Sequence, residues 1–226
     1  ADNPRLKLLS VMDHTPGQRQ TANVERMHER LVAAGRSAEE IEEIMARRHA
    51  GRDPGVAYDN RRKVVAFARE YGLPLAAHDD ETIEHVDEAQ DDGCVIAEFP
   101  VTLPAARKAR EYGMFVAMGA PNFVRGGSHS GNLSARETAQ ADALDILASD
   151  YVPLSMIRSA FMLIDELGWA PPKAIATVSS GPARSVGLTD RGDIAQGQRA
   201  DLVRVSRRSG GWPVPTEVWR QGARVA

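Results

Sequence analysis

Residues that could do chemistry follow directly after short apolar runs at five points in the chain. These are Leu8–Met12 before Asp13-His14, Leu75–Ala77 before His78-Asp79-Asp80, Val95–Ala97 before Glu98, Phe115–Gly119 before Ala120-Pro121-Asn122, and Ile146–Ser149 before Asp150. A neutral imidazole is a good ligand for Zn²⁺, and nearby carboxylates orient such ligands. His14, His78 and Asp150 are therefore candidate metal ligands.

These residues also have ordinary structural interpretations. His14 could be a turn histidine, His78 could cap a neighbouring backbone group, and Asp150 could cap the following segment. If the site forms, Asp150 is also the catalytic candidate, because a carboxylate beside a metal can accept the proton of an attacking water. Glu98 could face the same site or begin a helix.

The segment Gly119–Gly131 has a composition that suits an anion. Its glycines would let backbone N–H groups approach closely, and its polar side chains would add hydrogen-bond donors. We predict that it binds phosphate, with an ordinary surface loop as the alternative. The candidate contacts are Asn122, Arg125, Ser128, His129 and Ser130, together with Gln18 and Arg19 from the first polar turn.

Short apolar runs alternate with helical patterns along the chain, which predicts parallel βα units. The expected strands are Leu6–Met12, Pro74–Ala77, Cys94–Ala97, Met114–Met118 and Asp145–Ala148, and the expected helices between and after them are Thr82–Gln90, Leu103–Tyr112, Ala135–Leu144 and Ser155–Leu167. Since sites of α/β proteins form where parallel strands end, this order would bring the polar residues to one edge.

A three-helix insertion is expected after the first strand. It comprises Asn23–Ala34, a helix that Ser37 begins with Glu40 as its capping-box partner, and Tyr58–Tyr71. The pentapeptide Ala68–Gly72 recurs as Ala109–Gly113, which predicts two equivalent joints between a helix and a strand.

The C-terminal part changes character. Pro171–Gly187 suggests two short helices broken at Gly181-Pro182, and short strands are expected at Gly192–Ile194, Ala200–Val205 and Val214–Arg220. We predict a catalytic barrel domain over residues 1–187 and a small β domain over residues 188–226.

Composition excludes several classes of protein. The 226 residues are 42% hydrophobic and 26% charged, which is typical of a globular chain, and the net charge of −3 gives no electrostatic footprint for nucleic acid. No apolar run approaches the roughly 18 residues of a membrane span. The single Cys94 rules out a disulfide within the chain. We expect a cytoplasmic enzyme that binds neither nucleic acid nor membrane.

Several of these segments resemble signatures of the PhnM family of phosphonate metabolism. They are Val11–Gln20, Ala77–Asp80, Ile96–Pro100, Met118–Asn132 and Ser149–Tyr151. The closing segment Gly197–Val203 is similar to the tail of amidohydrolase-superfamily proteins in general.

The resemblance implies an α/β metal-dependent hydrolase on a (β/α)₈ TIM-type barrel with a small β appendage. It implies hydrolysis of the small phosphorylated molecule α-D-ribose 1-methylphosphonate 5-triphosphate to the 5-phosphate and pyrophosphate. His14, His78 and Asp150 match the family's pattern of metal ligands. The implied cofactor is a divalent metal ion, zinc first, with manganese, iron or nickel as alternatives.

The chain departs from that family by lacking the paired ligands of a first barrel strand before His14. We therefore expect it to correspond to the C-terminal portion of the barrel, about its last five strands, with open strand edges that invite pairing with another copy. Two alternatives remain: a metal-dependent amidohydrolase or deaminase that cleaves a C–N bond, and a catalytically silent fragment that serves as an assembly subunit.

Overall fold

The computed structural model describes residues 3–12, 24–49, 54–127, 132–207 and 211–226. Contacts divide the chain into two compact units. The first contains the described residues up to Met114 together with Asn132, and the second contains the remaining described residues from Phe115 onward.

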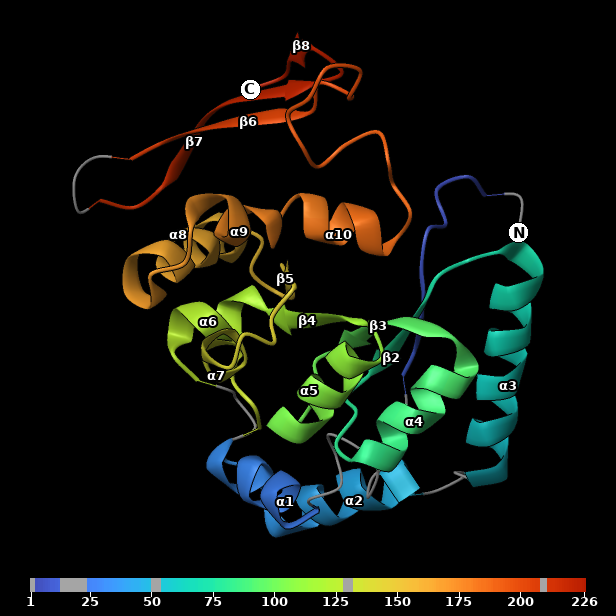
Figure 1. Ribbon diagram of the computed structural model, residues 1–226. Coiled ribbons are helices and arrows are strands. Elements are labelled where there is room, and N and C mark those ends of the chain that lie inside the picture. The colour runs from blue at the N-terminus through green and yellow to red at the C-terminus, as the bar shows by residue number, and fades with distance from the viewer. Residues whose placement is uncertain (1–2, 13–23, 50–53, 128–131, 208–210) are drawn as a thin grey trace. The chain divides into compact units, whose positions relative to one another are not determined.

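The first unit is built from parallel strands and helices (Figure 1). In chain order its elements are β1 (Leu9–Val11), α1 (Val24–Ala33), α2 (Ala38–His49), α3 (Pro54–Tyr71), β2 (Leu75–His78), α4 (Ile83–Asp92), β3 (Cys94–Glu98) and α5 (Leu103–Glu111). Strand β2 lies between β1 and β3, is parallel to both, and is buried along its whole length. This burial explains why its sequence is continuously apolar rather than alternating.

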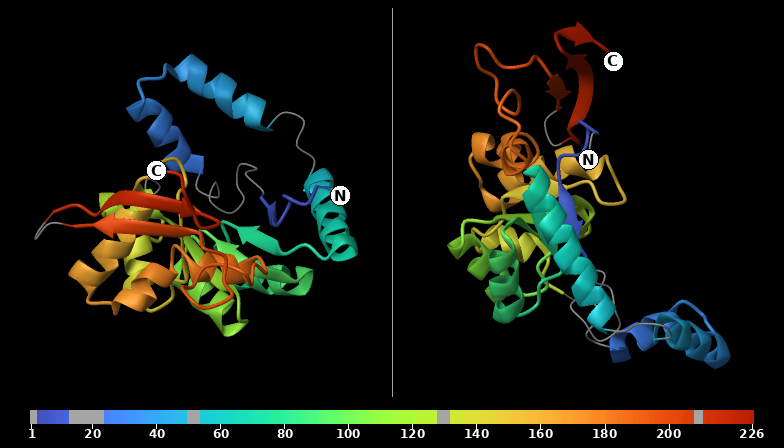
Figure 2. Two further views of the ribbon diagram at one scale, coloured as in Figure 1. Left: turned by 90° about the horizontal axis from the view of Figure 1, so that it is seen from above. Right: turned by 90° about the vertical axis from the view of Figure 1, so that its right-hand side faces the viewer.

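The second unit combines α/β elements with a separate antiparallel sheet. Its elements are β4 (Phe115–Gly119), α6 (Ala120–Arg125), α7 (Ala135–Gln140), β5 (Ile146–Ala148), α8 (Ser155–Leu167), α9 (Pro171–Ala176), α10 (Ser180–Ser185), β6 (Leu202–Ser206), β7 (Val214–Arg220) and β8 (Ala223–Arg224). Strands β4 and β5 are parallel, whereas β6, β7 and β8 form an antiparallel sheet in that order. Figure 2 shows β6 and β7 side by side.

Local signals in the sequence specify several helix ends as predicted. Ser37 and Glu40 form the expected capping box, with Ser37 N–H donating to Glu40 Oε2 at 2.9 Å and Glu40 N–H donating to Ser37 Oγ at 3.2 Å. The repeated pentapeptides end in left-handed Gly72 and Gly113, with φ of +61° and +79°. After each glycine, the next N–H donates back to the alanine carbonyl that begins the repeat, at 2.9 Å and 3.0 Å. Both joints are therefore equivalent, as expected.

Other predicted elements were wrong. Residues expected to form only a loop contain α6, because Pro121 suits the first turn of a helix and left-handed Gly126 ends it. Helix α7 ends at Gln140 rather than Leu144. The break between α9 and α10 falls before Ser180, so Gly181 and Pro182 lie inside α10, where a proline in the first turn costs no hydrogen bond.

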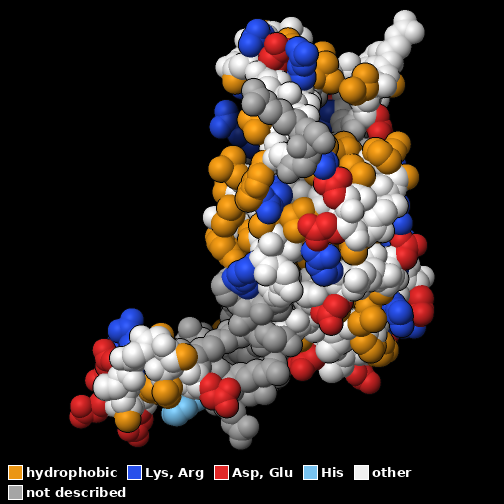
Figure 3. All heavy atoms as spheres, turned by 90° about the vertical axis from the view of Figure 1, so that its left-hand side faces the viewer, with side chains coloured by type: hydrophobic (Ala, Val, Ile, Leu, Met, Phe, Trp, Pro, Cys, Tyr) orange, Lys and Arg blue, Asp and Glu red, His pale blue; other side chains and the backbone are white. Residues whose placement is uncertain are grey.

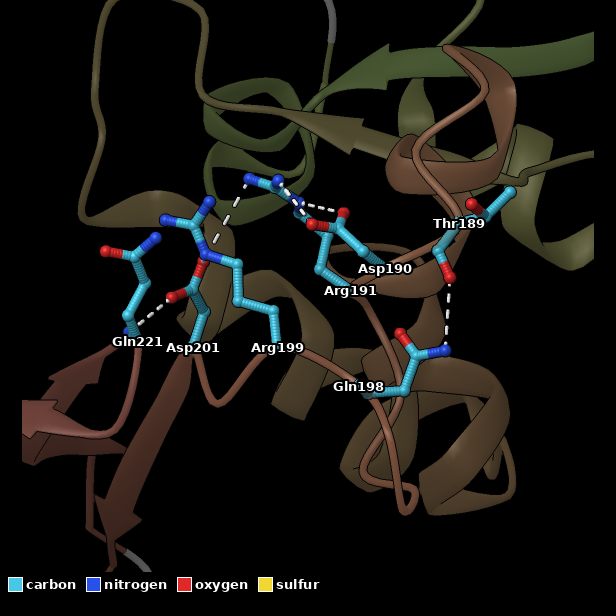
Figure 4. A network of polar contacts seen from close by, with 7 residues as sticks. All are labelled: Thr189, Asp190, Arg191, Gln198, Arg199, Asp201 and Gln221. Carbon is cyan, nitrogen blue, oxygen red and sulfur yellow. Dashed lines mark hydrogen bonds and ion pairs between the residues drawn. The ribbon is translucent and has the colours of Figure 1, made fainter.

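The tail contains strands near two of its three predicted segments. Residues 192–194 are not a strand. Instead, residues 189–201 connect α10 to β6 through polar contacts (Figure 4). Asp201 accepts the Gln221 N–H at 2.8 Å and pairs with Arg199 at 2.8 Å, and Arg191 donates twice to Asp190, at 2.7 and 2.9 Å. The segment Gly197–Val203 therefore links this connection to the end of β7 through the hydrogen bond between Asp201 and Gln221.

The described surface mixes polar and apolar side chains. Figure 3 shows basic and acidic side chains interspersed on one face, with hydrophobic side chains between them. Leu154 and Trp212 are among the exposed apolar residues, at 85% and 65%. Within the described residues, no helix is both long and apolar enough to cross a membrane.

Gly181 packs closely against backbone carbonyl groups beside strand β5. A Cβ at this position would lie 2.8 Å from the carbonyl oxygens of both Ala176 and Asp145, and neither atom belongs to a flexible side chain. We expect Gly181→Ala to lower the free energy of unfolding by about 1–3 kcal/mol, because overpacking outweighs alanine's helix propensity. Chemical denaturation would measure this loss.

The matched control is Gly127→Ala, where a Cβ would meet nothing within 4 Å and φ is not left-handed. It should change the free energy of unfolding by less than about 0.5 kcal/mol. Equal stability of the two variants would contradict the packing argument.

Candidate active site

His78 and Glu98 form the central contact of the candidate site in the first unit. They end the neighbouring parallel strands β2 and β3 and are register partners across them. The His78 Nδ1 lies 2.8 Å from Glu98 Oε2, and the imidazole is buried, with 9% of its side chain exposed. The strand pairing therefore places an imidazole directly against a carboxylate.

The charge state of Glu98 determines which group donates in this contact. Burial raises the pKa of Glu98, but the hydrogen bond and charge of His78 and a hydrogen bond from Ser10 outweigh it, so the pKa lies below its ordinary value. The Ser10 hydroxyl on β1 donates to the same oxygen, Oε2, at 3.0 Å. Because an ionised carboxylate only accepts, the Nδ1 of His78 carries a proton and donates it to Glu98.

The residues after His78 and Glu98 hold the imidazole from other sides. The Phe99 ring packs edge-on against it, with centroids 5.3 Å apart and an interplanar angle of 88°. The Nε2 of His78 lies 3.4 Å from Oδ2 of fully buried Asp79. Asp79 and Phe99 both have left-handed backbones, with φ of +59° and +55°. Positive φ is uncommon for residues other than glycine and concentrates at functional sites.

The loops that follow β2 and β3 are hydrogen-bonded to each other. Asp79 N–H donates to the Glu98 carbonyl at 2.9 Å, and Val101 N–H donates to the Asp80 carbonyl at 2.8 Å. The Thr102 hydroxyl donates to the Glu81 carbonyl at 2.7 Å and also caps α5. These bonds satisfy backbone groups beyond the last paired residues of β2 and β3. They also fix the path of the chain directly after His78.

In the second unit, the predicted catalytic residue Asp150 lies two positions after β5. It is exposed and left-handed, with φ of +47°. The next residue, Tyr151, accepts a hydrogen bond from Arg125 Nη1 at its hydroxyl, at 3.3 Å. Arg125 ends α6 and is exposed. A carboxylate and a guanidinium therefore belong to adjoining segments of one unit.

Asn122 has a structural role in the second unit. Its Oδ1 accepts the Ala135 N–H at 3.1 Å, which ties α6 to the first turn of α7. Ser159 of α8 donates to the Ala120 carbonyl at 3.0 Å in a buried contact. Helix α6 is therefore braced from two sides, and this holds Arg125 at its end. Phosphate contact by Asn122 stays a prediction.

Six of the predicted site residues lie outside the described residues. They are His14, Gln18, Arg19, Ser128, His129 and Ser130. Among the residues that the structure does describe, no three histidine, cysteine or acidic side chains converge as a metal site. Of the two proposed ligands that the structure describes, His78 has the surroundings typical of a metal-binding imidazole, because a carboxylate holds Nδ1 and Nε2 faces a second carboxylate. Metal binding by His14, His78 and Asp150 together stays a prediction.

Sequence reasoning missed three contributors to these arrangements. Ser10 is one hydroxyl in a short strand, Phe99 is one aromatic residue before a proline, and Tyr151 was singled out only as part of a motif. The signal that could have indicated Ser10 is strand register, which needs the pairing of β1, β2 and β3.

The fold and the motifs define the class of protein. The model of the amidohydrolase family matches residues 34–226, so this chain belongs to the amidohydrolase family. Members of this family are hydrolases. The chain is 44% identical over 225 residues to the α-D-ribose 1-methylphosphonate 5-triphosphate diphosphatase of Escherichia coli K12. This match covers 96% of the chain and 58% of the relative, so the chain spans somewhat more than half of that protein's length.

Other proteins are similar over part of the sequence or in fold. The chain is 33% identical over 103 residues to the imidazolonepropionase of Streptomyces griseus, covering 40% of the chain and 26% of that relative. It resembles the crystal structure of an amidohydrolase from Thermotoga maritima, with a TM-score of 0.57, 18% identity and coverage of 97% and 62% of the two chains.

It also resembles the 5-methylcytosine deaminase of Klebsiella pneumoniae, with a TM-score of 0.54, 15% identity and coverage of 84% and 60%. The predicted α/β fold, corresponding to part of a TIM-type hydrolase barrel, is confirmed.

The lowered pKa of Glu98 predicts a specific dependence of stability on pH. An acid whose pKa is lower in the folded state contributes stability above its ordinary pKa of 4.5, and loses it as the pH falls through the folded value. We expect Glu98→Gln to be less stable than the parent chain near pH 6, and this difference to shrink as the pH falls toward about 3. Denaturation of both chains across that range would measure it.

Glu70→Gln serves as the control, because Glu70 is an exposed carboxylate at the end of α3. Its difference from the parent chain should stay near zero throughout. A Glu98→Gln difference that grows as the pH falls would have the wrong sign for this argument.

Proposed function

We propose that this chain forms part of a metal-dependent hydrolase that cleaves α-D-ribose 1-methylphosphonate 5-triphosphate. One water would be consumed, and the products would be the 5-phosphate and pyrophosphate. The observation that carries the proposal is 44% identity over 96% of the chain to a relative named for this diphosphatase activity. The buried imidazole–carboxylate pair where β2 and β3 end adds support from the structure.

The proposed metal ligands are His14, His78 and Asp150, with zinc as the first candidate and manganese, iron or nickel as alternatives. When bound, such an ion would supply a water of lowered pKa. Asp150 would accept the proton of that water. The exposed position of Asp150 after β5 suits a group that must reach water and substrate.

The proposed phosphate contacts would offset charge on the triphosphate. Arg125 is the described residue that fits best, because its exposed guanidinium ends a helix braced by α7 and α8. A fixed cation near a phosphoryl group stabilises charge that develops during transfer. The further proposed contacts are Asn122, Ser128, His129, Ser130, Gln18 and Arg19.

Cleavage of a C–N bond is the second candidate. The match to a relative named imidazolonepropionase favours it, although over only 103 residues. Arg125 favours the phosphorylated substrate instead, since a cyclic amide offers no polyanion for a guanidinium. An assay with both substrate classes separates the two proposals.

Removal of metal tests the metal-dependent part of the proposal. We expect the protein purified without chelator to contain about one or two divalent ions per chain and to release pyrophosphate from the triphosphate substrate. Chelation should abolish release, and addition of zinc, manganese, iron or nickel should restore it.

Metal content by plasma mass spectrometry and pyrophosphate release are the measurements. Activity that persists without metal would contradict the proposal, and turnover of cyclic amides alone would favour the C–N hydrolase. A chain that takes up no metal and turns over neither substrate would support the assembly subunit.

Asp150→Asn tests the catalytic assignment. Asparagine tolerates the left-handed backbone of this position, so the fold should persist. We expect kcat to fall by a factor of about 10² to 10⁴ because the general base is lost, while substrate still binds. Steady-state kinetics and equilibrium binding would measure the two effects.

Asp142→Asn is the matched control, since Asp142 is also exposed and left-handed, with φ of +55°. It should keep near-normal turnover. Near-normal turnover of Asp150→Asn would remove Asp150 from the catalytic role.

A further inference from the structure

We propose that Glu98, supported by Ser10, is a positioning residue that holds the His78 ring with its proton on Nδ1. In this orientation Nε2 points away from Glu98 and toward Asp79. The inference deepens the proposed function and rests on it for its purpose, since Nε2 would be the atom offered to a metal ion. The arrangement itself is a property of this chain and can be measured without metal.

Three neighbouring strands each supply one member of the arrangement. Ser10 comes from β1, His78 ends β2, and Glu98 ends β3. The hydroxyl and the imidazole both bond to one carboxylate oxygen, Oε2, at 3.0 Å and 2.8 Å. Because the strands are parallel and paired in this register, the three groups meet without any contribution from a loop.

The hydrogen bond on one ring nitrogen determines which nitrogen carries the proton. The Oε2 of Glu98, 2.8 Å from Nδ1, would hold the proton of His78 on that nitrogen. A 180° flip of the ring would replace Nδ1 by a carbon atom and lose this bond. Packing of Phe99 edge-on against the ring also defines its plane, at 88°. The orientation of the ring is therefore over-determined.

The environment of the other nitrogen suits a cation. Nε2 lies 3.4 Å from Oδ2 of Asp79, which is fully buried. A lone pair beside a buried carboxylate oxygen is a favourable place for positive charge and an unfavourable one for an apolar group.

Nitrogen NMR of the imidazole rings tests the proposal directly. The full chain would be labelled with ¹⁵N-histidine, freed of metal, and studied at a pH where its own spectra show the ring to be neutral. His78→Gln would assign the His78 signals among those of the six histidines. We expect a protonated Nδ1 and an unprotonated Nε2 in the parent chain.

Variants of Glu98 and Ser10 then test the cause. Glu98→Ala should convert the His78 signals to a mixture of both tautomers, whereas Glu98→Gln, which keeps an acceptor, should preserve Nδ1–H. Ser10→Ala should move the Nδ1 proton resonance, and Ser10→Thr, which restores a hydroxyl, should return it. Ser10 lies on an exposed part of β1, so these two variants keep the test available if Glu98→Ala does not fold. Glu70→Gln should leave the spectrum unchanged.

A parent chain with its proton on Nε2 would overturn the proposal. So would a His78 pattern that is unchanged in folded Glu98→Ala or, where that variant does not fold, an Nδ1 proton resonance that is unchanged in Ser10→Ala. If the predicted tautomers are found in a chain that neither binds zinc nor hydrolyses the triphosphate, the positioning role stands and the proposed function fails.

Discussion

The pairing of β2 with β3 is the constraint on which the candidate site depends. In this register His78 lies opposite Glu98, and all four residues of β2 are buried. A shift of the pairing by one residue would reverse which face of the sheet each side chain occupies. The imidazole–carboxylate contact therefore follows from the hydrophobic burial of β2, and the energy that holds the site is mainly the energy that holds the sheet.

The chain changes direction sharply where these strands end, and that change has a conformational cost. Left-handed Asp79 and Phe99 each cost on the order of 1–3 kcal/mol in backbone strain. The reciprocal hydrogen bonds between the two exit loops offset part of this cost. These backbone conformations place the Phe99 ring edge-on against the imidazole. They also place the Asp79 carboxylate beside Nε2 of His78.

Much of the fold could be predicted from the sequence, because its signals are local. Continuous apolar runs indicated the buried strands, and Ser37 with Glu40 indicated a helix start. Helix α6 was missed because the glycines of its neighbourhood suggested a phosphate loop, while Pro121 and the braces from α7 and α8 favour a helix.

In the candidate site, too, local features could be predicted from the sequence, whereas contacts between distant segments could not. His78 could be singled out because it follows an apolar run, and the structure does bring it to a carboxylate. The role of Ser10 could not be found, since it depends on the register between strands β1 and β2, in which Ser10 pairs with Ala76, 66 residues further along the chain. Convergence of His14, His78 and Asp150 also depends on long-range packing, so local sequence patterns alone could not establish it.

The two groups of candidate residues differ in their surroundings, and the difference matches the tasks proposed for them. His78 and Asp79 are buried, where low dielectric strengthens a contact with a metal ion and excludes competing water. Arg125 and Asp150 are exposed, where a long guanidinium can meet a hydrated polyanion and a carboxylate can exchange a proton with water. A hydrolase acting on a triphosphate needs both environments: a fixed ligand for the ion, and solvated groups for a highly charged substrate.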